Sequence, residues 1–155
     1  MTDVQTEDLP QLQVNMQYIK DLSFEIPGAP QSFIEMQGKA PEIPIHVDVT
    51  VSNVGGNSFE VVLHLKIDAG LEGKSLFILE LAYAGVFTLN LPEEQVHPVL
   101  LIECPRLLFP FARNIVADMT RDGGLPPLLL QPLDFASLYQ ARLQEMQAEH
   151  AAGQA

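Results

Sequence analysis

Apolar and polar side chains alternate along three stretches of this chain, and this alternation limits its fold more strongly than any other feature. Even positions are mostly apolar in residues 12–26, and odd positions are apolar in residues 43–51 and 59–67. Successive side chains of a β-strand point to opposite faces, so each run predicts a strand with one buried face. Ile19 and Lys20 interrupt the first run, which indicates a bend or a β-bulge. The apolar positions of that run are expected on one face: Leu12, Val14, Met16, Tyr18, Leu22, Phe24 and Ile26.

A fourth run, residues 76–89, is apolar on both faces except at Glu80 and Thr88. A strand that is polar on neither face is expected to be covered on both sides. Glycine-containing turns at residues 53–57 and 69–73 join the later runs, so we expect the four strands to form an antiparallel meander. Residues 27–41 make a long connection with apolar side chains, which indicates either packing on the body or a functional segment.

Helical spacing replaces alternation after residue 90. Prolines at positions 98, 105 and 110 are expected to divide this part into short pieces, the main one being residues 106–121. After an extended apolar stretch at residues 125–132, Asp134 is expected to cap a last helix. The sequence therefore predicts an α+β fold: a four-stranded antiparallel sheet with two main helices on one side.

Length and composition indicate one folded domain. The chain has 155 residues, 47% of them hydrophobic, which is too apolar for a disordered chain. We expect a disordered acidic tail at residues 1–10, a folded domain at 11–146 and a disordered C-terminal tail at 147–155. No start typical of a signal peptide and no apolar run of about 20 residues is present, so a soluble cytoplasmic protein without membrane insertion is expected.

The net charge of −12 argues against nucleic-acid binding, because such a surface repels phosphates. Sequence motifs also give no reason to expect an enzyme or a cofactor. His46 and His64 lie on neighbouring predicted strands and could face each other, but a third metal ligand is missing from the pattern, and solvated histidines are the better interpretation. Cys104 has no histidine nearby and is expected to be a buried, inert thiol. We therefore predict no catalytic residues, no metal and no cofactor.

Apolar surface is in excess. Two helices can cover only one face of a four-stranded sheet, yet the fourth strand is apolar on both faces and residues 107–119 are apolar around much of the helix. Ordinary monomers do not expose that much apolar surface. Burial between subunits is the commonest explanation, and a groove for apolar ligands is the alternative.

Four segments, in order, resemble the SecB family of bacterial protein-export chaperones. They are residues 18–30 (YIKDLSFEIPGAP), 80–87, 104–113 (CPRLLFPFAR) and 124–138, and the resemblance extends over residues 11–146. It implies an α+β subunit in a homotetramer, a dimer of dimers. It also implies an ATP-independent chaperone that keeps non-native secretory precursors unfolded and delivers them to the SecA translocation motor.

The resemblance also implies two binding regions. By parity, Asp21 and Glu25 share the polar face of the first strand, while Ile78 and Glu80 share one face of the fourth. In the SecB family, matching positions bind the basic, zinc-carrying tail of SecA. Clients are expected in a groove beside residues 27–41 and the last helix, with the candidate lining Phe33, Met36, Phe135, Leu138, Tyr139 and Leu143.

Two alternatives stay open from the sequence. A SecB-like chaperone of a toxin–antitoxin system would have the same fold with another client, and a retained acidic patch favours export. A small-molecule enzyme on an oligomeric α+β fold would need a converging polar cluster in a pocket, and the sequence contains no such pattern.

Overall fold

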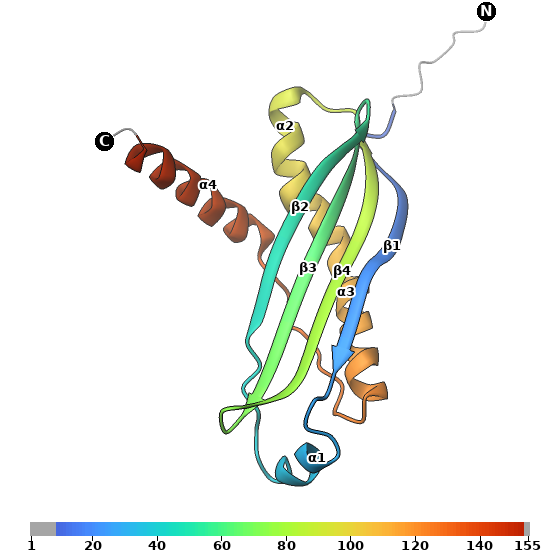
Figure 1. The fold of residues 1–155 in the computed structure, drawn as a ribbon. Helices are drawn as coiled ribbons and strands as arrows, with labels where there is room; N and C mark the ends of the chain where they lie inside the picture. Colours follow the sequence, from blue (N-terminus) through green and yellow to red (C-terminus); the bar gives the residue numbers. More distant parts are fainter. Residues whose placement is uncertain (1–8, 154–155) are drawn as a thin grey trace, which may run out of the picture.

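The computed structural model describes residues 9–153 as a sheet with a helical layer on one face (Figure 1). Its four strands are β1 (Leu12–Glu25), β2 (Ile45–Gly55), β3 (Ser58–Leu71) and β4 (Lys74–Leu89). Its helices are α1 (Gln31–Glu35), α2 (Glu93–Pro98), α3 (Cys104–Asp122) and α4 (Phe135–Ala152), with a π-helical segment, η1 (Val99–Glu103), between α2 and α3. The predicted α+β class, with a four-stranded antiparallel sheet and two main helices, is confirmed. Residues 1–8 of the expected N-terminal tail lie outside the described part.

The strand order is β1-β4-β3-β2, and every neighbouring pair is antiparallel. The meander therefore includes only β2, β3 and β4, so the prediction that all four strands follow in spatial order is wrong. The long connection between β1 and β2 lets β1 pair with the far edge of β4. As a result, β1 and β2 are the two edge strands.

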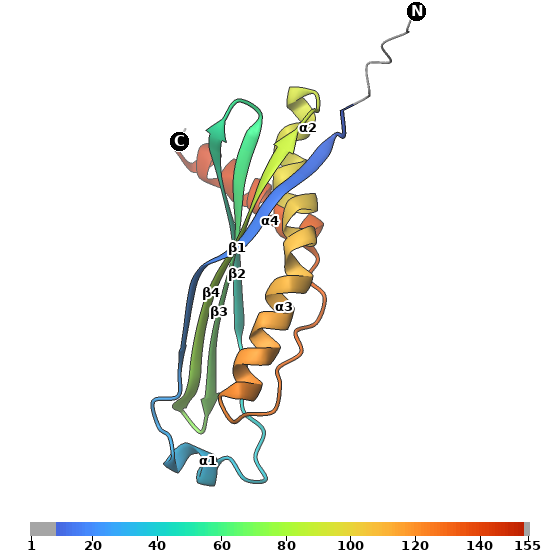
Figure 2. The ribbon, with the colours of Figure 1, turned by 90° about the vertical axis from the view of Figure 1, so that its right-hand side faces the viewer.

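The core lies between the sheet and α3, as Figure 2 shows. Odd positions of β4 point to this inner face, and Leu79 and Phe87 are completely buried there against helix residues such as Leu108. Gly123 ends α3 directly over the ring of Phe24. Thr120 holds the segment after the helix, because its Oγ1 accepts a hydrogen bond from the Leu128 N–H at 2.9 Å.

The outer face of the sheet is not covered by any helix of the described residues (Figure 2). The fourth strand was expected to have cover on both sides. On this face Ala82 and Ala84 are buried by neighbouring side chains, among them Val62 and Tyr18, instead of by a second layer. Short side chains on β4 are enough for burial when longer ones on both neighbouring strands close over them.

Two β-bulges in β1 change which residues face the core. Register shifts occur between Val14 and Met16 and between Ile19 and Asp21, the second at the predicted place. Each extra residue moves the following side chains to the other face. Met16 and Tyr18 therefore lie opposite Val86 and Ala84 on the outer face, so their expected place beside Leu22 and Phe24 is wrong.

Residues 93–122 form a nearly continuous helix, although three prolines were expected to divide it. The π-helical segment precedes Pro105 and accounts for that proline, whereas Pro110 lies within α3 itself. The Cys104 N–H donates to the Val99 carbonyl, five residues back, and this wider turn accommodates the proline ring that an α-helical turn would clash with.

Helix α4 begins at the predicted cap, where an Asp134 carboxylate oxygen accepts from the Ser137 N–H at 3.1 Å. The helix then projects from the body beside β2 (Figure 1). It continues to Ala152, through most of the stretch that the sequence analysis expected to be a loose tail. Alanine, glutamine and glutamate, which are good helix formers, dominate that stretch.

Candidate functional sites

The outer face of β1 and β4 carries the four residues Asp21, Glu25, Ile78 and Glu80, which we call the acidic patch. In the register of the two strands, Glu25 pairs with Ile78, Ser23 with Glu80, and Asp21 with Ala82. Paired residues share a face, so the three acids and the isoleucine occupy three consecutive rows. All three carboxylates are exposed and Ile78 is half-buried. The patch thus offers negative charge with one apolar contact.

A shallow hollow of about 290 Å³ adjoins this patch and extends to β2. Asp21 and Glu80 line it from the patch. Its other polar lining residues, which the sequence did not assign to the site, are His46, Asp48, His64 and Lys66. Lys66 lies 3.5 Å from the Glu80 carboxylate in an exposed ion pair. The pairing register of β2 with β3 places these residues beside the patch. That register depends on the turn between the two strands, and the pattern of either strand by itself does not specify it.

The two histidines do not form a direct cross-strand pair. His46 lies opposite Lys66 and Asp48 lies opposite His64, so the histidines are diagonal neighbours. The His64 Nε2 instead lies 2.9 Å from the Thr50 hydroxyl. In the described part of the chain, no three His, Cys, Asp or Glu side chains converge as metal ligands.

A second polar cluster on the outer face joins β1 to β3 across β4. Lys20 Nζ lies 2.7 Å from Glu60 Oε1, and the Tyr18 hydroxyl donates a hydrogen bond to Glu60 Oε2. The Lys20 ammonium and the Tyr18 hydroxyl lower the pKa of Glu60. The bond to Glu60, together with burial, raises the pKa of Tyr18 to about 12. This cluster was not predicted, because Glu60 reaches β1 only through the strand order β1-β4-β3, which alternation does not give.

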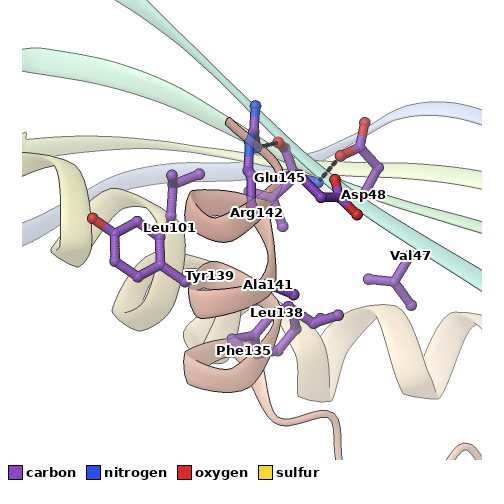
Figure 3. Close-up of a pocket in the computed structure, with 10 residues that line it drawn as sticks. Val47, Asp48, Leu101, Phe135, Leu138, Tyr139, Ala141, Arg142 and Glu145 are labelled. Atoms are coloured by element: carbon purple, nitrogen blue, oxygen red, sulfur yellow. Dashed lines mark hydrogen bonds between the residues drawn. The ribbon is translucent and has the colours of Figure 1, made fainter. Parts of the chain in front are cut away.

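An apolar pocket of about 340 Å³ lies between β2 and α4 (Figure 3). Three of the six predicted groove residues line it: buried Phe135, exposed Leu138 and half-buried Tyr139. Val47 and Leu101 close the apolar part, while Asp48, Arg142 and Glu145 supply its charges.

One hydrogen bond and one ring contact fix α4 over this pocket. Arg142 Nη1 donates to the Val49 carbonyl of the edge strand at 2.9 Å (Figure 3). The Tyr139 ring packs on His97 of α2 with ring centres 5.7 Å apart. The helix is therefore held at its first two turns, while its later turns project away.

The other predicted groove residues do not line this pocket. Phe33 of α1 packs near Gly124, and Met36, which follows α1, is half-buried against the core. Leu143 is half-buried on α4. A separate apolar pocket of about 590 Å³, which the sequence did not indicate, lies between α3 and residues 129–133, with Arg106 and Arg113 at its rim.

Cys104 is completely buried, as expected, and burial raises the pKa of its thiol to about 12. A thiol in that state is a poor nucleophile. None of the helices in residues 9–153 is both long enough and apolar enough to cross a membrane.

Comparisons with known proteins give a matching family and several relatives of this chain. A family model described as preprotein translocase subunit SecB matches residues 5–146. A protein-export protein SecB from Paramagnetospirillum magneticum is 85% identical over 151 residues, covering 96% of this chain and 97% of that protein. A protein-export protein SecB from Rhodospirillum rubrum is 58% identical over 145 residues, covering 94% and 90%.

A solved structure with a similar fold is a SecB-like chaperone from Mycobacterium tuberculosis in complex with a ChAD peptide from the HigA1 antitoxin. The TM-score is 0.66 at 18% sequence identity, and the match covers 79% of this chain and 91% of that one. At that identity the likeness extends to the fold alone.

Proposed function

The chain belongs to the SecB family of preprotein-export chaperones, and from this premise we propose that it holds non-native secretory precursors in the cytoplasm without ATP and hands them to SecA. It is an export chaperone and not an enzyme. The toxin–antitoxin alternative receives no support from the Paramagnetospirillum magneticum and Rhodospirillum rubrum relatives, which are export proteins. The identity of the motor, its binding site and the oligomeric state are our proposals.

The acidic patch is the observation that carries the SecA step. Its three exposed carboxylates share a sheet face with the half-buried Ile78, and no helix of the described residues covers that face. A basic tail that carries zinc complements that surface in charge. The zinc would belong to the partner, because metal ligands do not converge in the described residues of this chain.

Charge reversal tests this site. We expect the triple variant Asp21→Lys/Glu25→Lys/Glu80→Lys to lose measurable binding of the zinc-loaded SecA tail in titration calorimetry, while client binding persists. Single neutralisations should weaken tail binding about two- to fivefold each, the size expected for exposed charges. The control Glu93→Lys/Glu94→Lys changes exposed acids on α2 and should leave tail affinity near the wild-type value. Unchanged affinity of the triple variant would exclude the patch as the site.

The pocket between β2 and α4 is the proposed client site. Leu138 is 43% exposed at its edge, and an extended non-native segment would bury it at about 25 cal/mol per Å². A folded protein hides its apolar side chains, so the pocket selects unfolded chains. Binding of the unfolded state alone slows refolding by mass action.

A refolding assay without nucleotide tests the holdase function. A molar excess of the wild type should slow the refolding of a secretory precursor. Leu138→Glu should weaken this effect, because it places a charge at the pocket. Met146→Glu is the matched control, since Met146 is also exposed on α4 but does not line the pocket. Unaltered refolding at molar excess would count against a holdase.

A homotetramer is proposed from uncovered apolar surface on two elements. Met16 and Ile19 are about half exposed on the edge strand β1, and Leu107 and Phe111 are similarly exposed on α3. Edge pairing of β1 and stacking of α3 between dimers would cover both sets. Light scattering at micromolar concentration should give four times the chain mass of 17.1 kDa. A monomer mass would refute the assembly.

A further inference from the structure

The acidic patch exists only because β1 contains the bulge at Lys20. Tyr18 lies opposite Ala84 on the outer face, and Asp21 lies opposite Ala82 on the same face. Strict alternation from Tyr18 would instead place residues 20, 22 and 24 outside. Asp21 and Glu25 would then point to the core, and Leu22 and Phe24 would point to solvent. One extra residue therefore decides on which face the patch forms.

Glu60 holds the side chain of the bulged residue, Lys20, together with that of Tyr18, two residues before it. It belongs to β3, with β4 between it and β1, so the contact spans the width of three strands. Its carboxylate binds the Lys20 ammonium through one oxygen and the Tyr18 hydroxyl through the other. The small side chains of Ala82 and Ala84 on β4 leave the path across the sheet open. The Glu60 side chain is only 14% exposed while that of Lys20 is 51% exposed, so screening by solvent is reduced mainly at the carboxylate.

We propose that Glu60, acting through Lys20 and Tyr18, is a positioning residue for the binding of a basic partner at the acidic patch. The inference rests on the proposed role of that patch as the SecA-tail site. Glu60 itself lies opposite Val86, beyond the rows that contain the patch. It acts by fixing the bulge that turns Asp21 and Glu25 outward.

The sign of one substitution separates this role from simple electrostatics. Lys20 is a positive charge next to Asp21, so charge alone predicts that its removal strengthens the binding of a basic tail. If Lys20 anchors the bulge, its removal weakens that binding. Lys66 provides the matched control, because it is an outer-face cation paired with Glu80 and lies away from the bulge.

The experiment is calorimetric titration of the full-length protein with the zinc-loaded tail peptide. We expect Lys20→Met to weaken binding about two- to tenfold, which is the lower part of the range seen for coupled neighbours, and Lys66→Met to strengthen it. Lys20→Arg keeps the cation and should restore near-wild-type affinity. Tyr18→Phe removes one hydroxyl without changing charge and should also weaken binding, and it keeps the test valid if Lys20→Met fails to fold.

Hydrogen exchange on the same proteins tests whether the bulge becomes less stable in the variants. Amides of residues 19–22 should exchange faster in Lys20→Met and Tyr18→Phe than in the wild type and in Lys66→Met. If the wild type does not bind the tail, the SecA site and this inference fall together. If it binds and Lys20→Met binds equally well or more tightly, the positioning role is overturned while the SecA site stands.

Discussion

Gly85 of β4 allows the sheet and the long helix to approach each other. A Cβ atom at this position would lie 2.8 Å from Phe87 Cε2, 2.9 Å from Phe87 Cζ and 3.0 Å from Leu108 Cδ2. Both neighbours are completely buried in the centre of the core, so neither side chain can move toward solvent. We therefore expect Gly85→Ala to destabilise the fold.

The size of this effect follows from two opposing contributions. Overpacking a filled core costs about 1–3 kcal/mol. Replacing a strand glycine by alanine recovers about 0.5–1 kcal/mol by reducing the freedom of the unfolded chain. Subtracting the two ranges gives a net loss in the free energy of unfolding of about 0–2.5 kcal/mol. Because both neighbours are completely buried, we expect its upper part, about 1–2.5 kcal/mol, which lowers the melting temperature by about 2–10 °C in a chain of this length.

Urea denaturation at one fixed protein concentration measures this loss, because the apparent stability of an oligomer depends on concentration. Gly70→Ala is the matched control: its added Cβ would meet the Lys74 carbonyl oxygen at an ordinary 3.5 Å, so no loss is expected. Combining Gly85→Ala with Leu108→Val should recover part of the loss, since the smaller side chain makes room. A Gly85→Ala protein as stable as the wild type would refute the reasoning.

Three further predictions concern single groups. The raised pKa of Tyr18, about 12 against an ordinary 10, means that the folded state binds the phenolic proton more tightly. Its stabilising contribution is thus complete below pH 10 and lost as the pH rises from 10 to 12, and Tyr18→Phe should show a shallower alkaline slope in stability measured by denaturation. Thr120→Val removes the acceptor of the Leu128 N–H and should cost about 1–3 kcal/mol in urea unfolding, with faster exchange of that amide, whereas Thr120→Ser should keep the amide protected. Cys104 should react with a thiol reagent only in denaturant, and rapid reaction of the native protein would contradict its burial.

Alternation predicted the strands well because each strand of this sheet has one face toward the core. The runs at residues 43–51 and 59–67 appear as β2 and β3, and their odd residues point to the core. Alternation gave no information on strand order. The position of β1 beside β4 depends on contacts between residues more than 50 positions apart, such as the hydrogen bond from the Tyr83 hydroxyl to Gln17.

Other differences have local physical causes. Val14 and Met16 are both apolar although a bulge separates them, and each is substantially exposed, so the hydrophobic pattern contained no sign of the shift. The helix at residues 93–122 passes Pro105 through the π-helical turn, which is a backbone adjustment that composition does not specify, and α3 continues through Pro110.

The two candidate sites differ in how far the sequence predicted them, because one depends on parity within strands and the other on contacts between distant segments. The acidic patch could be inferred by parity. Its four residues lie in the part of the β1–β4 pairing that follows the last bulge of β1, where the alternation is regular. The client pocket depends on the angle at which α4 leaves the body. That angle is set by Arg142 on the Val49 carbonyl and by Tyr139 on His97, which are contacts between distant segments. Leu143 and Met36 consequently met the criterion of an apolar side chain near a groove, but do not line this pocket.

The placement of the two sites bears on the proposed transfer of a client to SecA. Transfer requires a state in which both partners are bound, so their sites must not overlap. The patch lies on β1 and β4, while the pocket lies between α4 and β2, which is the opposite edge strand. Val47 and Asp48 are the residues through which they approach each other, since both line the hollow beside the patch and the pocket. A basic tail confined to the patch would leave the pocket free, whereas one that extended across the hollow would reach Asp48 and remove a carboxylate from the client site. On this geometry, the reach of the tail over the outer face decides whether SecA only tethers the loaded chaperone or also weakens its hold on the client.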